Sequence, residues 1–191
     1  MRLDRLLAAI LILSPGFLPV ISSPAHAAAG ASDVGLTKLH AAHLELKGKT
    51  VHLWGGITGN ATDYSFEADE LTGDLSATAG KGSSVFTHAV FTGSADKHTQ
   101  VIAKVRSVEQ GYTQEIHADK GVYDVDPSGK TDGTMVFTGH VTMISKSSAI
   151  LAAPGTTTFG RLKLVLGKGP DYPQIQGDSV DATFIPNKGS E

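Results

Sequence analysis

Histidine is the residue type in this sequence that most invites a chemical interpretation. The chain has eight histidines and no cysteine, so a metal site would need imidazole and carboxylate ligands. His40 and His43 could share one face of a helix, but they would point in opposite directions on a strand. The remaining histidines beyond residue 27 stand singly in different parts of the chain: His52, His88, His98, His117 and His140. This scattered arrangement predicts surface histidines with at most a weak response to pH, and no metal site.

Enzyme signatures are missing from the sequence. It contains no Gly-x-Ser-x-Gly nucleophile elbow. The Gly-Lys-Thr triplets at 48–50 and 129–131 are not phosphate-binding loops, because the position five residues before each glycine is not glycine. Asp124 and Asp126 shortly precede Pro127 in a turn-forming stretch, where aspartate is expected to make local hydrogen bonds. We therefore expect a protein that has no catalytic residues and no cofactor.

A short phrase recurs along the chain and indicates internal repetition. A residue typical of strands is followed two positions later by Ala or Gly and then by Asp, at 66–69, 116–119 and 175–178. Apolar runs that include glycine accompany these phrases. A single strand-turn-strand unit cannot bury its apolar face alone, so the copies are expected to stack and share one core. Because they recur with the repeat, Asp69, Asp119 and Asp178 are predicted at turns or ladder ends.

The N-terminal segment resembles a secretory signal. Arg2 and Arg5 precede an apolar stretch over residues 6–20, and Ala25-His26-Ala27 supplies the small residues of a cleavage site. We expect residues 1–27 to be removed as a signal peptide and the protein to be exported. An uncleaved membrane anchor over residues 6–22 is the alternative.

Length and charge limit the remaining possibilities. Residues 28–185 are predicted to form one β domain, and residues 186–191 a disordered tail. The whole chain has a formal charge of −3, and loss of the two arginines and one aspartate of the leader makes it −4. Nucleic acid is not expected as a partner, because phosphate binding depends on clustered Lys and Arg.

Period-two alternation of apolar and polar residues predicts an all-β, antiparallel fold built from short strands. Turn-forming residues at 80–82, 126–129 and 167–170 separate the runs. The segment 34–46 could be a helix, but strand is favoured because it heads the first repeat and a turn follows it. The alternation and the repeat place these apolar side chains on inward faces: Val101, Ala103, Val105, Ile116, Met135, Phe137, Val141, Met143, Leu162, Leu164 and Leu166.

The strands around the second repeat resemble the OstA-like repeat of the LptA and LptC lipopolysaccharide-transport proteins. The matching residues are Ala118-Asp119, then Tyr123-Asp124, then Gly139-His140-Val141. The family pattern has Asn where His140 stands, and residues 55–57 depart from it further. The resemblance extends over roughly residues 36–185.

This resemblance implies a twisted β-jelly roll, open along one side as a trough. Family members hold the acyl chains of lipopolysaccharide in this trough and stack end to end across the periplasm. For this chain it implies a periplasmic protein that carries lipopolysaccharide or a similar amphiphilic lipid toward the outer membrane, with the inward residues above as the lipid-binding lining. The implied protein partners are other envelope transport components with jelly-roll domains and further copies of the chain.

An exported structural or protein-interaction domain with a filled core is the alternative function. The alternation does not show whether side chains or a ligand occupy the interior. The last predicted strand, 180–184, has neither Pro nor Lys to protect its edge, and this favours assembly. If the leader is retained, the protein would be an anchored, LptC-like subunit.

Overall fold

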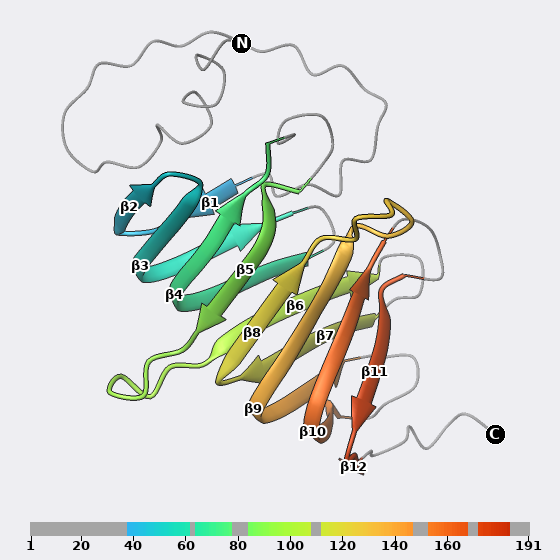
Figure 1. Ribbon diagram of the computed structural model, residues 1–191. Coiled ribbons are helices and arrows are strands. Elements are labelled where there is room, and N and C mark those ends of the chain that lie inside the picture. The colour runs from blue at the N-terminus through green and yellow to red at the C-terminus, as the bar shows by residue number, and fades with distance from the viewer. Residues whose placement is uncertain are drawn as a thin grey trace, which may run out of the picture.

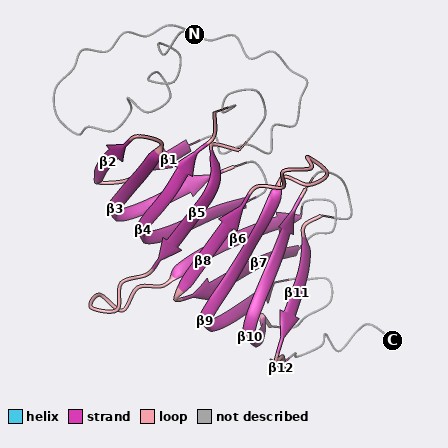
Figure 2. Ribbon diagram, in the orientation of Figure 1, coloured by secondary structure: helices cyan, strands magenta, loops and turns pink. Residues whose placement is uncertain are grey.

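The computed structural model describes residues 38–61, 64–77, 84–107, 112–146, 153–167 and 172–183, which form strands and no helix (Figures 1 and 2). The all-β prediction is confirmed, but the expectation of short strands is wrong for four of them, which have 11–14 residues because each crosses between two layers. The described part of segment 34–46 contains strands at 38–40 and from 43 onward. No helix long and apolar enough to cross a membrane occurs in these ranges. The predicted signal peptide, the tail and the turn at 80–82 lie outside the described residues.

Twelve strands are described, and all of their pairings are antiparallel. They are β1 (Lys38–His40), β2 (His43–Lys47), β3 (Thr50–Asn60), β4 (Tyr64–Leu75), β5 (Phe86–Thr92), β6 (Val101–Ser107), β7 (Tyr112–Ala118), β8 (Lys120–Asp124), β9 (Gly133–Lys146), β10 (Gly155–Leu166), β11 (Gln174–Asp178) and β12 (Asp181–Thr183).

The strands form one sheet that is folded into two layers. The front layer has the order β2-β3-β4-β5-β8-β9-β10-β11, and the back layer has the order β1-β3-β4-β6-β7-β9-β10-β12 (Figure 1). The long strands β3, β4, β9 and β10 belong to both layers. β4, for example, pairs with β6 through residues 64–67 and with β5 through residues 70–75. We call the line along which these strands cross between the layers the crease.

In the first repeat of the chain, a backbone irregularity in β3 lies at the crease. The register between β3 and β4 shifts between Trp54 and Ile57, so that two residues of β3 oppose one residue of β4. These two residues are Gly55 and Gly56, with φ angles of 86° and 87°. A β-bulge of this kind bends the strand and increases its twist, which redirects the strand into the other layer.

A β-bulge of the same kind occurs at the crease in the second repeat. The register between β9 and β10 shifts between Phe159 and Arg161, opposite Gly139 and His140. Gly139 has a φ of 75° and His140 a φ of 45°. The Gly-His pair of the resemblance motif is therefore the structural counterpart of the Gly-Gly pair in β3.

The recurring aspartates lie at the crease, which confirms their predicted role at turns and ladder ends. Asp119 occupies the bend between β7 and β8, and its main-chain N–H donates to the Gly139 carbonyl at 2.8 Å. Its carboxylate accepts a hydrogen bond from His140 Nδ1 at 2.7 Å. Asp69 lies opposite the bulge in β3 and accepts from Lys97 Nζ at 2.8 Å, and Asp178 is the last residue of β11.

The core lies between the layers and is formed by the inward face of every long strand. All eleven apolar positions predicted to face inward are buried. Paired residues of neighbouring strands share a face, so inward positions form continuous rows across a layer. One such row of the front layer contains Leu53, Leu71, Phe91, Phe137 and Leu162, which are all at most 3% exposed.

Substitution of Gly139 tests the crease. Gly139→Ala would force a left-handed backbone on a residue with a Cβ atom, at a cost of about 1–2 kcal/mol. The new atom would also lie 2.5 Å from Asp119 Oδ2. Gly56→Ala has the same backbone cost, but no atom lies within 4 Å of the added carbon. We expect urea denaturation to show a larger loss of stability for Gly139→Ala, and equal losses would contradict the tight packing of Asp119 against the bulge.

Candidate functional site

A cavity opens between the two layers, on the side away from the crease. Its walls come from the starts of β4 and β5 and from the ends of β6 and β10, with β8 and β9 between them. We call this opening the mouth. The residues that line it are Tyr64, Ser65, Phe66, Ser84, Val85, Phe86, Phe91, Ala103, Val105, Tyr123, Met135, Leu164 and Leu166.

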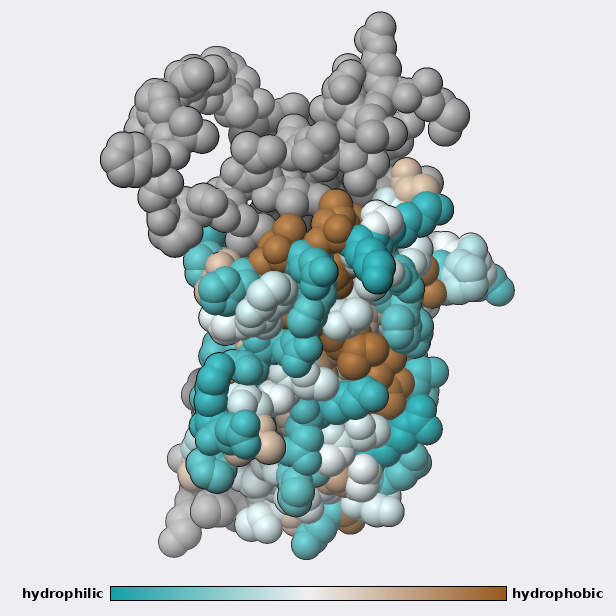
Figure 3. Space-filling model, turned by 60° about the vertical axis from the view of Figure 1, so that its left-hand side comes forward, coloured by the Kyte–Doolittle hydropathy of each residue, from teal (hydrophilic) through white to brown (hydrophobic). Residues whose placement is uncertain are grey.

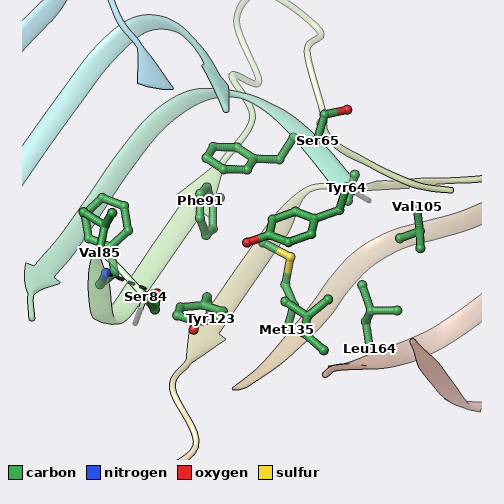
Figure 4. Close-up of a pocket in the computed structure, with 13 residues that line it drawn as sticks. Tyr64, Ser65, Ser84, Val85, Phe91, Val105, Tyr123, Met135 and Leu164 are labelled. Atoms are coloured by element: carbon green, nitrogen blue, oxygen red, sulfur yellow. Dashed lines mark hydrogen bonds between the residues drawn. The ribbon is translucent and has the colours of Figure 1, made fainter. Parts of the chain in front are cut away.

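The lining is apolar apart from four hydroxyl groups, and none of its residues is charged. Tyr64 and Tyr123 enter from opposite layers, and Met135 lies beside Tyr64 (Figure 4). Phe66 and Phe91 meet edge to face, with ring centroids 4.7 Å apart. An apolar wall with a few polar groups is the usual character of a site for a hydrophobic or amphiphilic ligand.

The cavity is narrow. The volume open to the centre of a water-sized sphere is about 40 Å³. Typical small-molecule pockets have volumes of roughly 300–1,000 Å³. Side chains therefore occupy most of the interior in this structure, and a hydrocarbon chain could enter only if the layers or the lining side chains moved apart.

Both tyrosines of the mouth are held in their neutral form. Burial raises the pKa of Tyr64 well above its usual range, and the nearby Tyr123 and Asp132 raise it further. Burial also raises the pKa of Tyr123. The Tyr123 hydroxyl donates a hydrogen bond to the main-chain oxygen of Asp132 at 2.7 Å. The mouth thus contains neutral hydroxyl groups next to a carboxylate.

The loop that leads to Asp132 is organised by Asp126. One carboxylate oxygen of Asp126 accepts hydrogen bonds from the main-chain N–H and the hydroxyl of Ser128, at 2.8 and 2.7 Å. The other accepts from the N–H and the hydroxyl of Thr131, at 2.9 and 3.0 Å. These bonds, led by that from the Ser128 hydroxyl, lower the pKa of Asp126. The expected local role of Asp126 is confirmed, and the loop presents Asp132 in a defined position.

The predicted lining residues divide into two groups. Ala103, Val105, Met135, Leu164 and Leu166 line the cavity at the mouth. The others are buried in the core outside this cavity: Val101, Ile116, Phe137, Val141, Met143 and Leu162. Contact of either group with lipid stays a prediction.

Sequence reasoning missed the aromatic part of the lining. Tyr64 and Phe66 continue the alternation of β4, so their pattern could have revealed them. Phe86 and Phe91 have opposite parity in β5, yet both are buried. The reason is a register shift after Asp74, which inserts one residue into β5. Such a bulge hides an inward face from a period-two pattern.

Four histidines of the described residues each contact a carboxylate: His52, His88, His117 and His140. His52 contacts Glu70 at 2.6 Å and His88 contacts Asp124 at 2.7 Å. His117 contacts Glu115 at 2.8 Å, and the hydrogen bond from His117 is the main cause of the lowered pKa of Glu115. No group of three potential metal ligands occurs within the described ranges. These pairs are cross-strand or same-face contacts of the sheet.

Comparison of the structure with solved structures gives a match, whereas comparison of the sequence does not. No protein-family model and no curated protein matches the sequence. Among solved structures, the chain matches LptH, the LptA-homologous periplasmic component of the lipopolysaccharide transport device of Pseudomonas aeruginosa, with a TM-score of 0.54. The match covers 82% of this chain and all of LptH, at 11% sequence identity. The fold is LptA-like. This confirms the β-jelly roll that the sequence resemblance implied.

Truncation of one lining residue tests the packing of the site. Leu164 is 2% exposed and lines the cavity, whereas its neighbour Val165 lies on the outer face. We expect Leu164→Ala to lower the free energy of unfolding by about 2–5 kcal/mol. Val165→Ala should cost less than about 1 kcal/mol. Equal losses in chemical denaturation would contradict the assignment of inward and outward faces.

Proposed function

We propose that this protein binds the acyl chains of an amphiphilic lipid between its two layers and transfers the lipid through the periplasm toward the outer membrane. Lipopolysaccharide is the preferred ligand. The observation that carries the proposal is the uncharged, mainly apolar mouth along one side of an LptA-like fold. The structurally similar LptH is described as a periplasmic component of lipopolysaccharide transport. The proposed role needs no catalytic residue or cofactor.

Acyl chains suit this interior energetically. Each buried methylene contributes about 0.8 kcal/mol, so burial of a long acyl chain can offset the free energy that is lost when the layers separate. Met135 at the mouth has a flexible, polarisable side chain that adapts to irregular hydrocarbon. Binding of this kind selects a class of lipid rather than one molecule. A lipid could then pass between sites of similar depth without a large change in free energy.

At both ends of the folded sheet the described residues include exposed apolar side chains, and we propose that these ends bind other jelly-roll domains or further copies of this chain. Leu44 and Leu46 pair with the buried Leu53 and Val51, so they continue the inward rows. They are nevertheless 37% and 49% exposed, because among the described strands β2 pairs with β3 alone and its other edge is free (Figure 3 turns this end toward the viewer). At the other end Val180 is 56% exposed.

Charge favours contact between unlike ends. The strands of the N-terminal end carry Lys38 and Lys47, with one acid, Glu45. The described residues of the C-terminal end, 172–183, carry Asp178 and Asp181 and no Lys or Arg. Opposite charges on the two ends favour head-to-tail stacking, whereas two like ends would repel.

A structural domain with a filled core is the second candidate function. The narrow cavity of about 40 Å³ favours it. The two functions differ in whether lipid reaches the inward faces.

Photocrosslinking distinguishes the two functions. A benzophenone amino acid in place of Val105, at the mouth, should crosslink lipid in an envelope preparation. The same group in place of Lys104 should not, because Lys104 points outward and its Nζ contacts Glu67 Oε1 at 3.1 Å. Equal labelling at both positions, or labelling at neither, would contradict a lipid-filled trough.

Light scattering tests the stacking of copies. We expect the mean mass to rise with protein concentration and to fall as salt is added, because screening weakens the attraction between the ends. Leu46→Glu should abolish the rise, since it places a negative charge on the exposed apolar row that would face the acidic C-terminal end. Thr72→Glu, on the exposed outer face of β4, should leave it unchanged. A strict monomer at high concentration would contradict self-assembly.

A further inference from the structure

Two side-chain acceptors, those of Gln114 and Asp132, adjoin residues that line the mouth without lining it themselves, and we call them the polar flank. Within the described residues, two buried side-chain atoms have no hydrogen-bond partner, Gln114 Oε1 and Asp132 Oδ2. Both are acceptors, and a buried acceptor without a donor destabilises a protein. We propose that this flank binds the uncharged, hydroxyl-bearing part of the lipid headgroup. The proposal rests on the lipid-binding function proposed above and names the headgroup chemistry that the site accepts.

Asp132 lies at the front-layer side of the mouth. Its main-chain oxygen accepts the Tyr123 hydroxyl at 2.7 Å, and its N–H donates to the Leu166 carbonyl at 2.9 Å. Tyr123 and Leu166 both line the cavity. The main chain of Asp132 is therefore fixed by two lining residues, while its carboxylate retains one buried oxygen without a donor.

Gln114 lies on the back-layer side. It is the Cα partner of Val105, which lines the cavity, so both side chains face the interior. On its other side Gln114 pairs with Ser145. This end of the inward row is polar, whereas the row nearer the crease contains Ile116 and Met143. On this inward face, polar residues therefore lie farther from the crease and apolar residues nearer to it.

The absence of cationic side chains from the lining and the nearby carboxylate of Asp132 select among headgroups. Hydroxyl groups can donate to Asp132 Oδ2 and Gln114 Oε1 and can also accept from the lining hydroxyls. A phosphate at this point would offer acceptors to acceptors and would place a negative charge next to Asp132. None of the lining residues is Lys or Arg. In a phosphorylated glycolipid, the sugar hydroxyls nearest the acyl chains would enter the mouth and the phosphates would remain in water.

Three palmitoyl compounds test this selection through displacement of the apolar dye N-phenyl-1-naphthylamine. Monopalmitoylglycerol has two hydroxyl groups, methyl palmitate has none, and palmitoyl lysophosphatidate has a phosphate. We expect monopalmitoylglycerol to bind about tenfold more tightly than either of the others, the gain of one satisfied buried acceptor.

Variants assign the preference to the polar flank. Asp132→Ala removes the carboxylate but not the main-chain bonds to Tyr123 and Leu166, and it should reduce the preference to about twofold or less. Gln114→Leu removes the second acceptor and provides an independent test if Asp132→Ala does not fold. Asp124→Asn is the matched control, because Asp124 is exposed on the outer face and contacts His88.

The outcomes separate this proposal from the lipid-binding function. Equal binding of the three compounds by the unmodified protein would overturn the headgroup proposal and leave lipid binding intact. An unchanged preference in both Asp132→Ala and Gln114→Leu would also overturn it. Failure of the dye and of every palmitoyl compound to bind would overturn both.

Discussion

The structure depends on one constraint: each of four long strands must pair with antiparallel neighbours in both layers. β3, β4, β9 and β10 can serve both layers only if the chain turns sharply within a strand while its hydrogen bonding continues on either side. The bulges at Gly55-Gly56 and Gly139-His140 provide this turn. Asp119 stabilises the second one through the Gly139 carbonyl and the His140 ring. The crease closes one side of the molecule by continuous backbone.

The opposite side and the two ends have no such closure, and the proposed functions follow from this difference. Across the crease the layers are covalently continuous, whereas at the mouth side chains such as Tyr64 and Met135 lie between the described parts of the two layers. Opening at the mouth therefore breaks packing contacts and leaves the ladders intact. At the ends, Leu44 and Leu46 extend the core to a surface that nothing in the described chain covers. The proposed lipid site and the two proposed docking ends thus follow from one architecture.

Sequence reasoning succeeded where one periodicity governed a strand and failed where a bulge interrupted it. The alternation of β6, β9 and β10 placed ten apolar residues correctly inside, and the repeat added Ile116 of β7. It missed Phe86 and Phe91 because the extra residue in β5 changes which alternate positions of the strand face inward. It identified Gly139-His140 as a motif without its role, since a positive φ is not visible in residue types. The flank formed by Gln114 and Asp132 joins distant segments and could not be predicted from either one.

The central claim is that the interior is a ligand site and not a permanently filled core. Native mass spectrometry of the mature protein, purified gently from an envelope fraction, tests this most directly. We predict a bound species whose mass corresponds to lipopolysaccharide or another long-chain amphiphile, and loss of that species after delipidation. A protein that carries no lipid from the envelope and also takes up no added lipopolysaccharide would contradict the account and identify a filled β domain.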